Sequence, residues 1–241
     1  MRPIGFSTGA IAKSDYRSAL ANLRVFNIRT VELSALRRWE LPLLIVDLHN
    51  LGLDDFDFVS FHVPSRFEPS DERSVVESLD RVWNGGIPIV IHPDVIYTPP
   101  LWKHFGSLLF IENMDKRKPI GRTARDLGQL FEQFPNARMC FDIGHARQVD
   151  PTMTEAKLIL ERYSDRLAQV HISDVNTSSR HDPISEYASR AFQSVAHLIP
   201  EHIPIILETL IDRGQSSIPK ELRRAGQALM RQRDDRIALA G

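Results

Sequence analysis

Short apolar runs rich in β-branched and aromatic residues recur eight times along this chain, and this recurrence most constrains its fold. The runs are residues 4–8, 30–34, 58–62, 88–92, 108–112, 138–142, 168–171 and 204–208. Most are apolar nearly throughout, as expected for parallel strands buried on both faces. Segments with apolar residues near the helical period lie between them, for example over 127–134. Strict alternation of strands and helices predicts a parallel sheet with right-handed crossovers.

The number of repeats predicts how this sheet closes. Eight units favour a closed (β/α)8 TIM barrel over the alternative, a doubly wound open sheet, and 241 residues is close to the size of one TIM barrel. No Pro- or Gly-rich linker divides the chain, so we expect one α/β domain over residues 1–241. The weakest predicted helices are those over 41–51 and 102–105. Predicted N-caps of the first, third and fifth helices are Ser14, Ser70 and Thr123.

Composition excludes several classes of protein. The formal net charge of -1 lacks the basic surplus of a dedicated nucleic-acid binder. Cys140, the single cysteine, excludes an internal disulfide and fits a reducing compartment. We find no signal peptide and no apolar run long enough to span a bilayer. The sequence therefore predicts a cytoplasmic enzyme with no membrane partner, and it leaves the oligomeric state open.

Polar residues close the predicted strands, where a TIM barrel places its active site. The last residues of the third to eighth strands, or those near them, are His62, His92, Glu112, Asp142, His171 and Glu208. A single histidine or glutamate at a strand end is usually a hydrogen-bonded structural residue. Several carboxylates crowd one buried mouth only if cations neutralise them or their pKa values rise. This set therefore predicts a divalent-metal site for Zn, Mn, Fe or Co.

With these residues the chain resembles the xylose isomerase-like TIM barrel superfamily. That group includes sugar and sugar-phosphate isomerases and epimerases, inosose dehydratases and endonuclease IV. The motifs that carry the resemblance are residues 31–34, 62–64, 92–93, 111–114, 142–145, 171–174 and 207–209. Each motif is weak alone, but their order and spacing cover essentially the whole chain.

The resemblance to the ketose epimerases implies one set of roles. In those enzymes the positions matching Glu112, Asp142, His171 and Glu208 hold one divalent ion, usually Mn or Co. The positions of Glu112 and Glu208 also exchange the substrate proton, and that of His145 contacts substrate oxygens. The implied activity is a metal-dependent isomerisation or epimerisation of a sugar or sugar phosphate through an enediolate.

The resemblance to endonuclease IV implies a larger metal set. There the positions of His62, His92 and Glu112 hold a first zinc, and the four residues above hold a second. A third zinc takes the positions of His145 and His181 with an aspartate where this chain has Ser179. Asp182 is the nearby candidate to replace that aspartate. Because serine is a poor zinc ligand, we expect one or two ions and rank a phosphodiesterase acting on abasic DNA second.

Other residues have weaker assignments. Arg147 and Arg180 are predicted to bind an anionic part of the substrate, and Glu32 to orient a ligand imidazole. Trp102 is predicted to form a wall against a sugar, with packing of its short helix as the alternative. In the phosphodiesterase interpretation, Arg37, Arg38 and Trp39 would contact DNA. Residues 116–118 are interpreted as a solvated charge run. A barrel that binds a ligand without catalysis is the third hypothesis, and nucleic acid is disfavoured as a partner.

Overall fold

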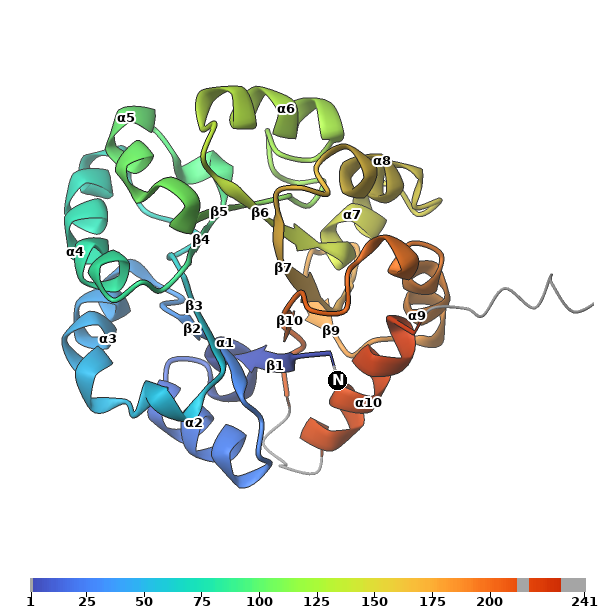
Figure 1. Cartoon of the computed structure of the whole chain (residues 1–241), viewed down its shortest axis with the longest axis horizontal. Helices are drawn as coiled ribbons and strands as arrows, with labels where there is room; N and C mark the ends of the chain where they lie inside the picture. The colour runs from blue at the N-terminus through green and yellow to red at the C-terminus, as the bar shows by residue number, and fades with distance from the viewer. Residues whose placement is uncertain (1, 212–216, 231–241) are drawn as a thin grey trace, which may run out of the picture.

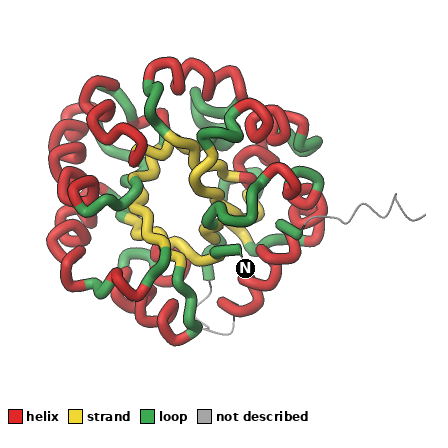
Figure 2. Tube along the Cα trace, in the orientation of Figure 1, coloured by secondary structure: helices red, strands yellow, loops and turns green. Residues whose placement is uncertain are grey.

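The computed structural model describes residues 2–211 and 217–230. Its central feature is a closed barrel of parallel strands in the order β1-β10-β7-β6-β5-β4-β3-β2 (Figures 1 and 2). The strands are β1 (Ile4–Ser7), β2 (Thr30–Ser34), β3 (Phe58–His62), β4 (Ile89–Ile91), β5 (Leu109–Glu112), β6 (Arg138–Asp142), β7 (Leu167–Ile172) and β10 (Ile205–Leu207). The predicted TIM barrel is therefore confirmed. Residues 1, 212–216 and 231–241 of the predicted 1–241 domain lie outside the described residues.

Helices surround the barrel on its outside (Figure 1). They are α1 (Thr8–Ala12), α2 (Tyr16–Val25), α3 (Leu41–Asp47), α4 (Glu72–Asn84), α5 (Pro99–Trp102), α6 (Ala124–Gln133), α7 (Ile143–Val149), α8 (Thr154–Arg162), α9 (Glu186–Gln193) and α10 (Ser217–Ala228). Apolar faces attach them to the strands: Leu127, Leu130 and Phe131 of α6 are buried in the shared core. No helix in the described ranges has both the length and the apolar character needed to cross a membrane.

The strands are apolar on both sides because each side meets a different layer. Val90, Phe110 and Cys140 form a separate buried cluster, whereas Ile89 and Ile91 belong to the main core. Alternate residues of a strand point to opposite faces, which explains this division. The barrel also needs a glycine where β1 meets β2, since a Cβ on Gly5 would lie 1.7 Å from the Thr30 carbonyl oxygen.

Strand register places the polar strand ends at one mouth. Asp142 of β6 pairs with His171 of β7, and Glu112 of β5 pairs with Cys140. Beyond the mouth, β8 (Asp174–Val175) and β9 (His181–Asp182) form a small antiparallel sheet that the sequence did not predict. This hairpin brings His181 back beside the strand ends.

Helix starts were predicted less well than strands. Thr123 accepts a hydrogen bond from the Asp126 amide, so the predicted cap of α6 is confirmed. The predicted caps Ser14 and Ser70 are wrong: Asp15 caps α2, and the helix that follows Ser70 begins without a side-chain cap. Several short polar residues precede both α2 and α4 in the sequence. Which of them can accept a hydrogen bond from the free amides of the first helical turn depends on the local backbone conformation.

Candidate metal centre

Glu112, the last residue of β5, lies at the centre of four imidazoles. Its Oε2 lies 3.1 Å from His62 Nε2, 3.4 Å from His92 Nε2 and 3.5 Å from His171 Nδ1. Its Oε1 lies 3.2 Å from His145 Nδ1. The Glu112 side chain is fully buried. One buried carboxylate thus connects residues from strands β3 and β7 with those that follow β4 and β6.

The four residues implied by the epimerase resemblance come together here. Ligand atoms of Glu112, Asp142, His171 and Glu208 all lie within 4.8 Å of one another. Among the described residues, each of the four has a buried polar atom without a hydrogen-bond partner: Oε1, Oδ2, Nδ1 and Oε2 in that order. Buried polar atoms are rarely left unpaired. A divalent cation that accepts these lone pairs fits the donor set, which is carboxylate oxygen with one imidazole nitrogen.

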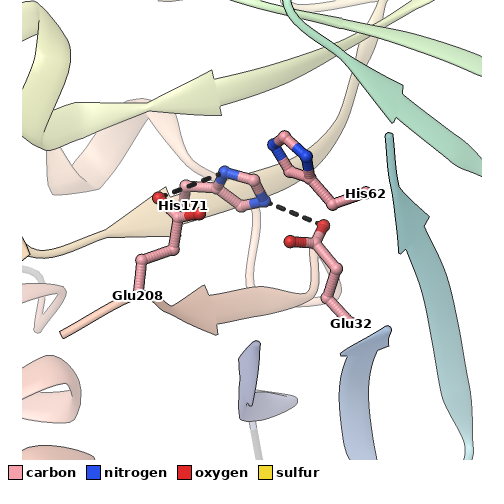
Figure 3. A group of neighbouring side chains, drawn as sticks. All are labelled: Glu32, His62, His171 and Glu208. Carbon is pink, nitrogen blue, oxygen red and sulfur yellow. Dashed lines mark hydrogen bonds and ion pairs between the residues drawn. The ribbon is translucent and has the colours of Figure 1, made fainter. Parts of the chain in front are cut away.

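A hydrogen bond to Glu32 orients the His171 ring. Nε2 of His171 lies 3.0 Å from Glu32 Oε2, so its N–H donates to that carboxylate (Figure 3). Nδ1, on the other side of the ring, lies 3.5 Å from Glu208 Oε2. Gln169 also donates to Glu32 Oε2, at 2.6 Å. Because Glu32 holds Nε2, Nδ1 is the ring atom left to bind an ion together with the other three residues of the set.

His62 and His92 form a second set with the same glutamate. Nδ1 of His62 donates to the Val63 carbonyl oxygen at 2.7 Å, and Nε2 donates to Glu112 Oε2 at 3.1 Å. An ion bound here would replace the Nε2 proton, since Nδ1 keeps its carbonyl partner. The His62 and His92 rings are 5.0 Å apart and edge to face. Ligand atoms of His62, His92 and Glu112 lie within 4.8 Å of one another. Glu112 is therefore shared by two candidate ion sites.

The pKa values show how this cluster balances its charge. Burial raises the pKa of Glu208 to about 8. Burial opposes protonation of His62, but Glu112 and Glu32 outweigh it and raise the pKa of His62 to about 9. Asp142 and Glu112 likewise raise the pKa of His145 to about 10 against the effect of burial. The cluster thus holds protons at neutral pH, and a divalent ion would take their place.

Neither Ser179 nor Asp182 joins the two remaining histidines, His145 and His181, in a candidate ion site among the described residues. Ser179 Oγ accepts a hydrogen bond from Gln148 Nε2 at 2.8 Å, and Asp182 Oδ2 accepts one from Asn176 at 2.7 Å. Ligand atoms of His145 and His181 do lie within 4.8 Å of those of Asp142. Asp142 already belongs to the four-residue set, so this third group has no carboxylate of its own among the described residues.

Residues 100–233 match the sequence model of the family described as xylose isomerase-like TIM barrel. This chain belongs to that family. No curated protein matches it.

Solved structures share the fold of this xylose isomerase-like chain at low sequence identity. Endonuclease IV from Thermus thermophilus aligns with a TM-score of 0.61 and 18% identity, over 95% of this chain and 99% of that one. A protein from Anabaena variabilis described as a proposed sugar phosphate isomerase/epimerase aligns with a TM-score of 0.59 and 15% identity, over 97% of this chain and 89% of that one. A xylose isomerase-like TIM barrel protein from Mycobacterium smegmatis in complex with magnesium gives 0.60 and 11%, over 95% and 98%. These likenesses establish the fold alone.

A cavity of about 450 Å³ opens above the cluster of this xylose isomerase-like barrel. Glu112 and Glu208, the two predicted proton-transfer residues, both line it, as do His145 and His181. Small polar side chains complete part of the wall, including Ser7 and Ser34, whose Oγ atoms lie 2.8 Å apart. The volume is in the range of small-molecule sites.

Two predicted substrate contacts lie away from this cavity. Trp102 is fully buried and its Nε1 donates to Glu72, so the prediction of a sugar-facing wall is wrong and the packing alternative holds. Arg147 pairs with Asp174 at 2.6 Å and is not among the described residues that line the cavity. The cause is helical geometry: Arg147 is two residues after His145 on α7, and residues two apart point to different sides.

Other residues at the site were not predicted. Asn113 holds the end of β6, because its side chain donates to the Asp142 carbonyl and accepts from the Asp142 amide. Lys13 lines the cavity beside the predicted Arg180. Arg37, which the sequence predicted only as a DNA contact, also lines it. The sequence could have indicated Asn113, since it directly follows Glu112 at the end of a predicted strand. Lys13 had no such signal, because it follows a helix of five residues rather than a strand.

Proposed function

We propose that this protein is a divalent-metal-dependent isomerase or epimerase of a sugar-like substrate. The observation that carries the proposal is the four-residue set, whose buried ligand atoms lack partners while two of its glutamates face one cavity. Glu112, Asp142, His171 and Glu208 would hold the ion, which would supply Lewis-acid polarisation of a substrate carbonyl group. The family to which the chain belongs, and the Anabaena protein of similar fold, support this class of reaction.

The side chains of this chain supply proton transfer. In the proposed reaction, Glu112 or Glu208 removes a proton from the carbon beside the carbonyl, and the electron pair moves onto that oxygen. The resulting enediolate takes a proton back, from the other glutamate for epimerisation. Burial raises the pKa of Glu208 to about 8, close to the range in which a carboxyl group both gives and takes protons near neutral pH. His145 lines the same cavity, and in the proposed reaction it would contact substrate oxygens.

Deuterium exchange tests this proposal. The full chain loaded with Mn, Co or Zn is incubated in D2O with a panel of ketoses and ketose phosphates. We expect metal-dependent exchange at one carbon, and at least a hundredfold loss in Glu208→Gln. Glu161→Gln, an exposed glutamate that pairs with Lys157, is the matched control and keeps full exchange. Absence of exchange with every substrate and metal contradicts the proposal.

A second candidate is an endonuclease IV-like zinc phosphodiesterase. The specific observation in its favour is the set His62, His92 and Glu112, because the proposed isomerase reaction requires only the four-residue set. Metal analysis separates the two: one ion per chain favours the isomerase, and two or three zinc ions with incision of abasic duplex favour the phosphodiesterase. We rank the phosphodiesterase second because Ser179 stands where endonuclease IV has a zinc-binding aspartate, and its hydroxyl is hydrogen-bonded to Gln148.

A further inference from the structure

Three cationic side chains line the cavity without a carboxylate partner. Lys13 follows α1, Arg37 follows β2, and Arg180 precedes β9. All three are exposed, and none forms an ion pair with another residue in the described ranges. Arg37 lies over the Trp39 ring at 5.1 Å, which leaves its charge available. The mouth therefore presents positive charge that the fold does not neutralise.

Two neighbouring cations, Arg147 and Lys118, differ from these three because acidic residues neutralise them. Arg147 pairs with Asp174 at 2.6 Å, and Lys118 pairs with Asp94 at 2.7 Å. These two cations are therefore neutralised within the fold, whereas Lys13, Arg37 and Arg180 are not.

Lys13 and Arg180 lie at the border between two cavities. A second cavity, of about 460 Å³, is lined by Lys13, Arg180 and His181, which also line the first. His181 lies on the metal-centre side, with its Nδ1 3.4 Å from Glu208 Oε2. Asp182, the acidic residue on the wall of the second cavity, accepts a hydrogen bond from Asn176 at 2.7 Å. An anion between Lys13 and Arg180 would therefore lie beside the metal ligands.

Unusual backbone conformations occur at Lys13 and at the residue directly before Arg180. Lys13 has φ 55° and ψ -121°, and Ser179, directly before Arg180, has φ 53°. Residues with a Cβ rarely adopt positive φ, and such outliers often mark functional positions. Glycine would relieve this cost at Lys13, so a side chain kept there is consistent with a use for its charge.

We propose that the substrate carries a phosphate group, which is held between Lys13 and Arg180 while its reacting carbon faces Glu112 and Glu208. Two unpaired cations from two different loops match a dianion better than a single carboxylate. Lysine supplies a point charge, and arginine supplies a planar pair of donors that fits phosphate oxygens. The orientation of the substrate rests on the proposed function, whereas the anion site stands on the cations alone.

Calorimetry with inorganic phosphate tests the site in the full chain loaded with one equivalent of Mn. We expect saturable binding that weakens at least tenfold in Lys13→Met and in Arg180→Met, with metal content unchanged. Lys116→Met, which removes an exposed lysine outside both cavities, changes the affinity less than twofold. Equal affinity in all variants would mean that phosphate binds elsewhere and overturns the inference. Acetate that binds as tightly as phosphate overturns the phosphate class.

Lys13→Gly separates phosphate binding from a structural role of the lysine, because phosphate affinity and the unfolding midpoint are both measured. We expect this variant to lose phosphate affinity as Lys13→Met does, while its unfolding midpoint stays the same or rises because the backbone cost is relieved. A lower midpoint would show that the lysine stabilises the fold instead. Phosphate binding without deuterium exchange on any sugar supports this inference and contradicts the isomerase. Deuterium exchange on neutral ketoses without phosphate binding supports the isomerase and contradicts the phosphate site.

Discussion

Glu32 is a fully buried carboxylate that supports the candidate metal ligands from behind. His171 and Gln169 donate to its Oε2, as does Ser60 at 3.2 Å. Burial opposes its ionisation, but His171 outweighs burial and lowers the pKa of Glu32. Sequence alone predicted Glu32 as the group that orients a ligand imidazole, and strand parity places it on the inner face. It did not identify Gln169, whose role depends on the register of two strands that are not adjacent in the barrel.

Replacement of Glu32 by glutamine tests this support. The change keeps the shape but removes the negative charge that fixes the His171 tautomer. We expect metal affinity to fall about 10- to 100-fold, measured by competition with a chromogenic chelator. Ser60→Ala, which removes a longer hydrogen bond to the same carboxylate, is the control and should have a smaller effect. Unchanged affinity in Glu32→Gln would exclude a positioning role.

The pH dependence of metal binding reports the protons that the cluster holds. The pKa of Glu208 is raised to about 8 and that of His62 to about 9, so both groups carry protons at neutral pH. A metal ion must displace them, and its apparent affinity should fall as pH decreases below about 8. Chelator competition between pH 6 and 9, with proton release followed in weak buffer, measures this slope. Affinity independent of pH would show that the ion binds elsewhere.

The segment after β4 depends on one carboxylate from a neighbouring element. Oε1 of Glu72, at the start of α4, accepts hydrogen bonds from the Tyr97 and Thr98 amides at 2.7 and 2.8 Å and from Trp102 Nε1 at 2.9 Å. These bonds hold the chain that follows His92. The sequence signal at Trp102 was ambiguous between wall and packing, and the partner that decides it lies 30 residues away.

Glu72→Gln should destabilise the fold. Burial opposes ionisation of Glu72, but the three N–H donors outweigh it and lower its pKa. A lowered folded pKa stabilises the protein above the ordinary glutamate value, and this stability is lost as pH falls through the folded pKa. We expect a loss of about 2 kcal/mol at pH 7 that shrinks below about pH 4, measured by urea unfolding. Glu77→Gln, on the exposed face of the same helix, should change stability by less than about 0.5 kcal/mol.

The alternation of apolar strands and helices in the sequence predicts the barrel, and the polar residues at the strand ends predict the candidate metal centre. Strands β2, β3 and β6 match the predicted ranges, and the others differ at their ends only. Buried parallel strands are readable because both faces are apolar. The residues Lys13 and Arg147 were missed or misplaced because loops and short helices, not strands, direct their side chains. Periodicity carries no information about such directions.

Removal of metal should lower the stability of the entire barrel. An ion at a hundred times its Kd stabilises the folded state by about 2.7 kcal/mol if it binds only that state. For a chain of this size, the midpoint of thermal unfolding should then fall by about 5 to 10 °C on treatment with EDTA. Calorimetry with and without chelator measures the shift. A midpoint that EDTA leaves unchanged would favour the third hypothesis, a barrel without a metal-dependent reaction.

The shared position of Glu112 has a consequence for how ions would fill the centre. A first ion in either set draws on the charge of a carboxylate that the other set also uses, so the two binding free energies are linked. By thermodynamic reciprocity, each ion changes the affinity of the other by the same factor. Titration should therefore give a cooperative or anticooperative curve rather than the sum of two independent isotherms. The residue at the centre of the barrel mouth would then act as a coupling element as well as a ligand.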